Sequence, residues 1–202
     1  IARFLIFQGM YRNRQLKFAL IKLTTKKNIA IKNIQGSEMY LDLKDEGISK
    51  DLILDGIREP ESTREIAKIL KPGNVVVEAG ANIGYYALME SKIIGGKGVV
   101  YAVEPSPRNF EYLNRNIKLN KRANMETYQL AIGDKNRKAS MNISPHSNLS
   151  SLVKQKNRRV TETIEVKVTT LDSFLEGKRY PDFIRMDVEG YEYNIVKGMK
   201  NI

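Results

Sequence analysis

Two glycines and an acidic residue surround a turn that could bind a small charged ligand. Gly80 and Gly84 are separated by three residues, and Glu78 stands two residues before the first of them. Glycine allows a ligand to approach the backbone closely, and a helix beginning near Asn82 would direct free N–H groups at an anion. Glu78 would repel a pyrophosphate but can accept a hydrogen bond from an ammonium group. The pattern therefore favours a ligand with both a carboxylate and an ammonium, such as the methionine end of S-adenosylmethionine, over a dinucleotide with its G-x-G-x-x-G turn.

A second acidic residue follows the next apolar run. Glu104 stands directly after the run from Gly98 to Val103, twenty positions beyond Gly84. In nucleotide-binding α/β folds an acid at this place accepts hydrogen bonds from ribose hydroxyls. Alone, the glycines also fit an ordinary strand–helix turn, and Glu104 also fits a surface position. The order of strand, turn, helix, strand and acid favours the ligand site.

Two carboxylates after a later apolar run could act on a hydroxyl group. Asp187 and Glu189 end the run that begins at Phe183, and alternation along an extended strand would send both side chains to one side. One carboxylate could orient or deprotonate a hydroxyl nucleophile, or both could instead shape the turn and cap the next helix. His146, the one histidine, is another candidate base, although a lone histidine in a loop is also typical of a solvent-exposed bystander.

These residues need elements that bring them to one place. Short apolar runs predict strands, and the segments between the first three of them predict helices. The predicted strands are 75–77, 98–103, 125–132 and 183–188, with added strands at 137–143 and 163–169; the predicted helices run from about 82 to 94, from Pro107 (capped by Ser106) to Leu119, and from Tyr191 to Met199. Upstream, residues 29–34 and 39–43 predict a hairpin and residues 60–70 a helix. The alternation predicts an α/β doubly wound parallel sheet with its strand C-termini at one edge.

Composition narrows the chemistry and locates the charge. The 202 residues include no cysteine and one histidine, so we predict neither a disulfide nor a metal site. Seven of the basic residues behind the net charge of +11 lie in residues 1–27, which contain no acid. This concentration weakens a nucleic-acid interpretation, which needs a basic face on the domain itself. A second basic run is formed by Lys154, Lys156, Arg158 and Arg159, which we interpret as a solvated loop or as a surface that steers an anionic substrate.

The basic N-terminal arm also carries an apolar stripe. Its members recur at spacings of three, four and seven and are Phe4, Phe7, Tyr11, Phe18 and Ile21. This spacing predicts an amphipathic helix within residues 3–23. The helix could pack on the domain or lie on an anionic membrane surface.

Taken together, the motifs resemble the FkbM family of S-adenosylmethionine-dependent methyltransferases. The resemblance covers about residues 36–200, and its matching stretches are Val75–Tyr86, Tyr101–Asn109, Leu130–Asp134, Leu171–Phe174 and Ile184–Gly198. It implies a Rossmann-like class I methyltransferase fold with S-adenosylmethionine as cofactor. It assigns the methionine end to Glu78, Gly80, Asn82 and Gly84, the ribose to Glu104, the adenine border to Asp134, and the transferable methyl to the neighbourhood of Asp187 and Glu189. We predict further cofactor contacts at Ala81, Tyr85, Pro105 and Ala131, and the resemblance places the loop 144–151 near the substrate.

The resemblance implies O-methylation of a hydroxyl on a glycan or small metabolite. Nucleic-acid methylation is an alternative that the Asp187–Gly190 stretch disfavours, because two acids would repel phosphates. A non-catalytic module on a membrane surface is another alternative, with residues 1–27 as the contact. We predict a basic helix over 1–28, a hairpin and helix over 29–73, and a methyltransferase domain over 74–202 in a cytoplasmic protein. Family members continue past Gly198, which implies that part of the sheet is absent here.

Overall fold

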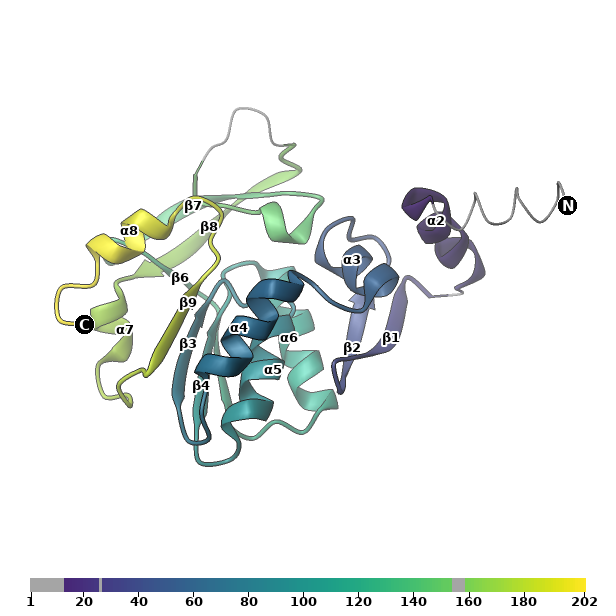
Figure 1. Ribbon diagram of the computed structural model, residues 1–202. Helices are drawn as coiled ribbons and strands as arrows, with labels where there is room; N and C mark the ends of the chain where they lie inside the picture. The colour runs from purple at the N-terminus through teal and green to yellow at the C-terminus, as the bar shows by residue number, and fades with distance from the viewer. Residues whose placement is uncertain (1–12, 26, 154–158) are drawn as a thin grey trace, which may run out of the picture.

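A four-stranded parallel sheet forms the centre of the molecule (Figure 1). The computed structural model describes residues 13–25, 27–153 and 159–202. Its central strands stand in the order β5-β4-β3-β9, with bounds β3 Val75–Ala79, β4 Val99–Val103, β5 Met125–Tyr128 and β9 Phe183–Met186. Parallel strands linked through helices confirm the predicted α/β class and bring all four C-terminal ends to one edge.

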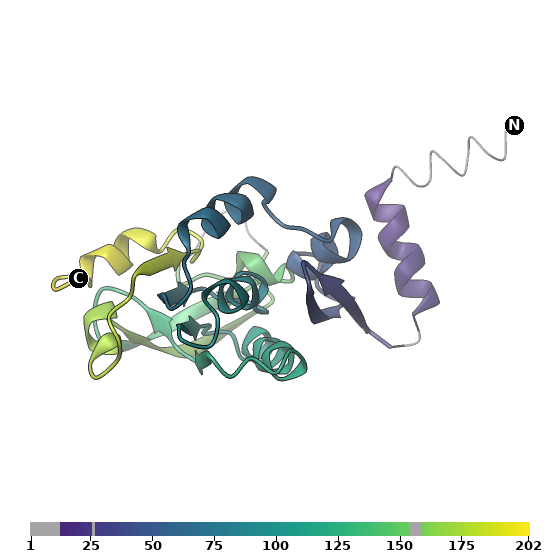
Figure 2. The same ribbon diagram turned by 60° about the horizontal axis from the view of Figure 1, so that its bottom comes forward.

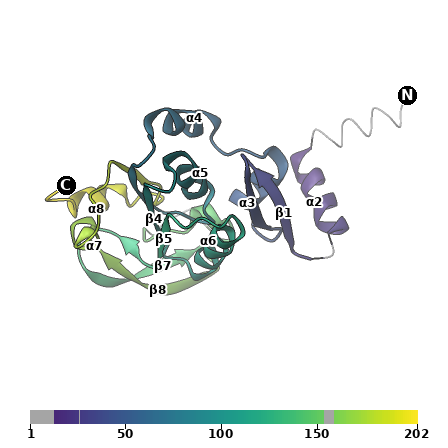
Figure 3. The same ribbon diagram turned by 90° about the horizontal axis from the view of Figure 1, so that it is seen from below.

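Both faces of the sheet are covered, as the apolar run in β3 predicted. All five residues of β3 are buried. Val76 packs toward α5 (Tyr85–Ile94) and α6 (Pro107–Leu119), whereas Val77 packs toward α7 (Leu171–Leu175) and α8 (Glu192–Lys197). Figure 3 shows α5 on one side of β4 and β5, and strands β7 and β8 on the other. The alternation of side chains along β3 therefore serves two separate cores.

The predicted strand over 125–132 is wrong in one respect, because the chain forms two strands there. It leaves the parallel sheet after Tyr128 and re-forms as β6 (Ala131–Ile132), which pairs with β8 (Glu162–Thr169) in a second sheet of order β6-β8-β7. The cause is packing: Ala131 contacts the small core around Val166, away from the central strands. The added strands are confirmed to within one residue, with β7 spanning Arg137–Ile143.

Four N-terminal elements form a separate layer beside the sheet (Figures 1 and 2). They are α2 Arg14–Thr24, β1 Ile29–Ile34, β2 Ser37–Asp42 and α3 Ile48–Asp55, whereas α4 (Pro60–Ile69) lies against α5. The predicted hairpin is confirmed, with Gln35 and Gly36 at positive φ in a two-residue turn. Helix α3 was not predicted, because only two full turns of apolar spacing mark it.

The described part of the amphipathic helix packs on the domain. Phe18 of α2 is buried among the core residues that include Ile48 and Leu52 of α3, whereas Leu23 is 82% exposed. Ile21, the other described member of the stripe, is partly buried against the same core. The stripe members Phe4, Phe7 and Tyr11 lie outside the described residues, as do Lys154, Lys156 and Arg158. None of the helices in the described ranges is long and apolar enough to cross a membrane. Contact with a membrane surface stays a prediction.

Candidate functional site

A cavity that encloses about 530 Å³, counting the open solvent at its mouth, lies where the parallel strands end. Gly80 follows β3, Glu104 follows β4, and Asp187 follows β9, and all three line this first cavity. The predicted site residues that line it are Gly80, Asn82, Glu104, Pro105, Ala131, Asp187 and Glu189. In open α/β sheets, ligands bind outside the carboxyl ends of the strands, so the first cavity has the position of a cofactor site.

Glu104 is held in place by backbone N–H groups. Its carboxylate is 4% exposed and accepts hydrogen bonds from Ser106 N and Asn82 N, each at 2.8 Å. Burial raises the pKa of this carboxyl to about 7, against the lowering effect of those two donors. A carboxylate has about four acceptor sites, so Glu104 still has lone pairs for the hydroxyls of a ligand.

The glycine turn differs from the prediction of free N–H groups near Asn82. Helix α5 begins at Tyr85, and Asn82 has a positive φ of 50°. The N–H groups of Gly80 and Ala81 both donate to Val103 O at 2.9 Å, and that of Asn82 donates to Glu104. The expected helix start at Asn82 is therefore wrong. The N–H groups near it are not free, because they already connect the end of β3 to the end of β4.

The two glycines of the turn have different structural roles. A Cβ at Gly80 would lie 2.2 Å from Asp187 O, so only glycine lets the turn after β3 approach the turn after β9. A Cβ at Gly84 would lie 2.8 Å from Leu113 Cδ1, which places Gly84 in the packing of α5 against α6. Gly84 does not line the first cavity.

Glu78 faces a partner that the sequence analysis missed. This carboxylate is 1% exposed, lies outside the lining of the first cavity, and accepts a hydrogen bond from Arg185 Nη1 at 2.6 Å. Burial raises its pKa to about 7, and the Arg185 guanidinium opposes that rise. The two residues stand opposite each other in the register of β3 and β9, so two opposite charges within apolar strands were the available signal. Contact between Glu78 and a cofactor ammonium stays a prediction.

Arg185 connects this buried acid to the candidate base. Its Nη2 lies 3.0 Å from Asp187 Oδ2, and its guanidinium lies 3.6 Å from the centroid of the Tyr86 ring. The Tyr86 hydroxyl donates to Glu59 at 2.9 Å, and burial raises the Tyr86 pKa to about 12. Asp187 is 37% exposed, so it is oriented from inside the protein while staying accessible to a ligand.

A second cavity adjoins the first and, with the open solvent at its mouth, encloses about 350 Å³. The two share Gly80, Asn82, Asn148 and Asp187, and the other residues of the second cavity are Ile48, Arg58, Glu78, Ala81, Tyr85, Tyr86 and Arg185. Asp187 therefore lies on the border between two hollows. Tyr85 is buried, and its hydroxyl lies 3.2 Å from Thr63 Oγ1.

Three other predicted residues occupy places that differ from expectation. Glu189 has a φ of 56°, and β9 ends at Met186, so the expected extended alternation from Asp187 is wrong, although both residues line the first cavity. Asp134 lines neither cavity, and it accepts from Tyr191 Oη at 3.2 Å. His146 also lines neither cavity, and its backbone N–H donates to Ser144 Oγ.

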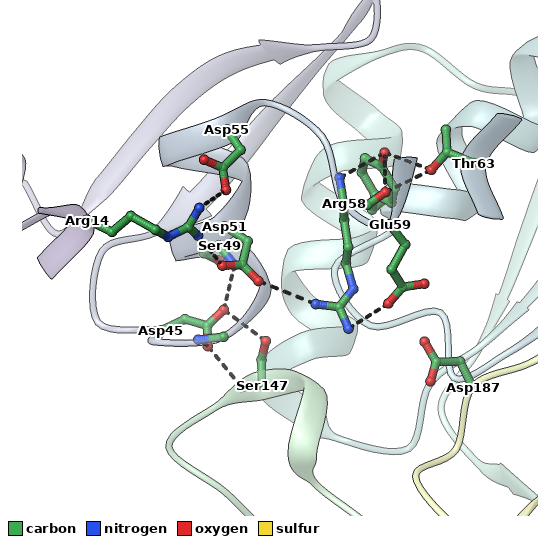
Figure 4. Close-up of polar contacts among 12 residues, drawn as sticks. Arg14, Asp45, Ser49, Asp51, Asp55, Arg58, Glu59, Thr63, Ser147 and Asp187 are labelled. Carbon is green, nitrogen blue, oxygen red and sulfur yellow. Dashed lines mark hydrogen bonds and ion pairs between the residues drawn. The ribbon is translucent and has the colours of Figure 1, made fainter. Parts of the chain in front are cut away.

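A buried acid fixes the loop that carries His146. Asp45 is 2% exposed and accepts hydrogen bonds from both Ser147 N at 2.9 Å and Ser147 Oγ at 2.8 Å (Figure 4). Ser147 and Asn148 both line the first cavity. The N-terminal layer therefore holds one wall of the site, a contact across 102 positions that no local pattern indicated.

Comparison with known proteins assigns the family. The model of the Methyltransferase FkbM domain matches residues 78–202. The chain belongs to the FkbM methyltransferase family. The match begins at the buried acid before the glycine turn and includes every strand-end residue of the first cavity. S-adenosylmethionine is the cofactor of this family, and the acceptor atoms of Glu104 together with the apolar lining of Leu130, Ile132 and Met141 fit its ribose and adenine.

Individual relatives are more distant. Hexuronic acid methyltransferase AglP of Haloferax volcanii is 26% identical over 153 residues, which are 72% of this chain and 59% of AglP. A tRNA(Phe) (4-demethylwyosine(37)-C(7)) aminocarboxypropyltransferase of Methanocaldococcus jannaschii is 40% identical over 65 residues, covering 32% of this chain and 26% of that enzyme. The crystal structure of methyltransferase FkbM from Methylobacillus flagellatus aligns with a TM-score of 0.43 at 20% identity, covering 74% of this chain and 37% of that one. The chain thus spans less than two thirds of the relatives that it matches.

Proposed function

We propose that this protein transfers a methyl group from S-adenosylmethionine to a hydroxyl group of a glycan or small metabolite. The observation that carries the proposal is the place of Asp187, on the border of two adjoining cavities. The first cavity has the position and lining for the cofactor. The second would receive the acceptor, whose hydroxyl would reach the same carboxylate.

The chain's own residues would position the reactants and move one proton. S-adenosylmethionine supplies an electrophilic methyl group on a sulfonium centre. Glu104 would hold the ribose, and Asp187 would accept the proton of the acceptor hydroxyl as its oxygen forms the new bond to the methyl carbon. The bond between that carbon and the sulfonium sulfur breaks in the same step, so the leaving group is S-adenosylhomocysteine. Arg185 holds Asp187 Oδ2 at 3.0 Å, so the carboxylate is oriented before a substrate arrives.

The relatives support the acceptor class unequally. AglP is named for methylation of a hexuronic acid, a hydroxyl-bearing sugar, and its match extends over 72% of this chain. The tRNA enzyme matches only 32% of it. Two carboxylates, Asp187 and Glu189, line the first cavity and would repel a phosphate backbone. A sugar hydroxyl is therefore the better supported acceptor.

Calorimetry and a transfer assay test the proposal. We expect S-adenosylhomocysteine, the product form of the cofactor, to bind and to raise the unfolding temperature by mass action, and NAD to do neither. Methyl-labelled cofactor should then label neutral and acidic sugars but not transfer RNA. Binding of NAD without binding of S-adenosylhomocysteine would overturn the cofactor assignment, and labelling of RNA alone would overturn the acceptor class.

A further inference from the structure

The second cavity also contains features that select its occupant. Because it shares Asp187 with the first cavity, ligands in the two hollows would meet at that carboxylate. We propose that the second cavity binds an uncharged, hydroxyl-bearing ring as the methyl acceptor, and that Arg58 selects it. This inference rests on the proposed methyl transfer and names the part of the chain that chooses the substrate.

The lining of the second cavity suits a small polar molecule. The lining combines an aliphatic side chain, Ile48, with guanidinium, carboxylate and amide groups. A few polar groups in a concave pocket are typical of sites that orient a small polar molecule.

The outer wall of the second cavity comes from residues upstream of the matched family domain. Ile48 lies on α3 and Arg58 lies between α3 and α4, whereas the family match begins at residue 78. The strand-end residues of the first cavity all lie within the match. The family domain thus builds the cofactor side, and the N-terminal layer supplies part of the acceptor side.

Arg58 is fixed from several directions (Figure 4). Its carbonyl oxygen accepts from Thr63 Oγ1 at 2.9 Å, and its guanidinium lies 3.0 Å from Glu59 and 3.6 Å from Asp51. The side chain is only 15% exposed. A guanidinium has five N–H donors, more than these two carboxylates use, so Arg58 keeps donors for a ligand oxygen.

The charges around the second cavity disfavour an anionic ring. Asp187 and Glu59 both lie within 4 Å of Arg185, whose Nη1 is already paired with Glu78. Arg58 in turn faces two carboxylates. A further carboxylate on the ligand would add a like charge to this group. A hydroxyl both donates and accepts, so a neutral ring satisfies Asp187 and Arg58 together.

The test compares two probe acceptors and three variants of the full chain. The probes are methyl α-glucopyranoside and glucuronic acid, with methyl-labelled S-adenosylmethionine as donor. The variants are Arg58→Ala, Arg58→Lys, and Arg64→Ala, whose arginine is exposed on α4 outside both cavities. Loss of one charge-assisted hydrogen bond should raise the KM for the glucoside about ten- to a hundredfold in Arg58→Ala, and less in Arg58→Lys.

Arg64→Ala should have the same KM for the glucoside as the parent. The parent should prefer the glucoside to glucuronic acid. The affinity for S-adenosylhomocysteine should not change in any variant. An unchanged KM in both Arg58 variants, or a preference for glucuronic acid, overturns the inference while methyl transfer still stands. If S-adenosylhomocysteine does not bind, or if neither sugar is methylated, the proposed function itself fails. Unfolding temperatures show whether Arg58→Ala folds, and Arg58→Lys decides the matter if it does not.

Discussion

The two cavities that meet at Asp187 are held together in different ways. In the first, most of the hydrogen bonds at the strand ends are made by backbone groups. Glu104 accepts from two backbone N–H groups, and the N–H groups of Gly80 and Ala81 both donate to Val103 O. The second is bordered by side chains that bind one another. Its chain of charges runs from Arg58 through Glu59 and Arg185 to Asp187, with successive separations of 3.0, 3.8 and 3.0 Å.

This difference separates what the fold requires from what it allows. Contacts between backbone groups at the strand ends do not depend on side-chain identity, so the turns after β3 and β4 stay in place through most substitutions that keep the fold. Side-chain contacts depend on residue identity, so the second cavity can change its charge and shape while the strands stay in place. A cofactor common to a family suits the first kind of wall, and an acceptor particular to one member suits the second.

Removal of the carboxylate that the cavities share should have the largest effect. Asp187→Asn keeps the side-chain size but loses the base, and we expect turnover to fall about 10²- to 10⁴-fold with little change in affinity for S-adenosylhomocysteine. Glu189→Gln tests the other candidate base, which lines only the first cavity. Initial rates and calorimetry distinguish the two effects. If Glu189→Gln takes the loss and Asp187→Asn does not, the two roles must be exchanged.

Removal of Arg185 should break the side-chain network. Glu78 is 1% exposed, and Arg185→Gln would leave it buried without its cation. We expect a loss of about 3–5 kcal/mol in the free energy of unfolding, measured with urea, and a smaller loss for Arg185→Lys, which keeps the charge without the planar fork. Lys138→Gln, which breaks an exposed pair with Glu165, should change little. Equal losses in the two glutamine variants would show that the buried pair adds no stability.

The backbone-held cavity should respond in two ways when its acid is removed. Glu104→Ala loses a ribose acceptor, which should weaken cofactor binding by about 1.5–3 kcal/mol. It also leaves Asn82 N and Ser106 N without their acceptor, so the unfolding temperature should fall as well. Glu111→Ala, at an exposed position on α6, is the control. Unchanged affinity in Glu104→Ala would assign this acid to the turn alone.

The same difference explains which features could be predicted from sequence. Val75–Val77, the glycine turn and Glu104 form a local pattern whose order alone indicates the sheet edge, and the structure places Gly80 and Glu104 in one cavity. The pair Glu78 and Arg185 is 107 positions apart. Its recognition requires the β3–β9 register, which periodicity does not give. The start of α5 was misplaced because Asn82 adopts a left-handed conformation that its residue type permits but does not require.

The smallest expected effect tests whether the side-chain network ends in a protonated acid. Glu90 of α5 is fully buried beside Glu78, and burial together with that neighbour raises its pKa well above the usual value of 4.5. Burial also raises the pKa values of Glu78 and Glu104 to about 7. A raised pKa means that the folded state binds more protons than the unfolded state, so the contribution of these groups to stability is fully present below about pH 4.5 and falls as pH rises toward 7.

Glu90→Gln replaces the protonated acid with a neutral group of similar shape and removes its contribution to this slope. We expect the urea midpoints of parent and variant to lie close together at pH 5 and to separate above it, with the decline from pH 5 to pH 8 shallower in the variant. Glu65→Gln, at an exposed position on α4, should follow the parent. Parallel curves for parent and Glu90→Gln would mean that Glu90 loses its proton as easily in the folded as in the unfolded chain. Glu90 would then hold no extra proton to share with Glu78. The network behind Asp187 would end at Glu78 on β3 rather than at Glu90 on α5.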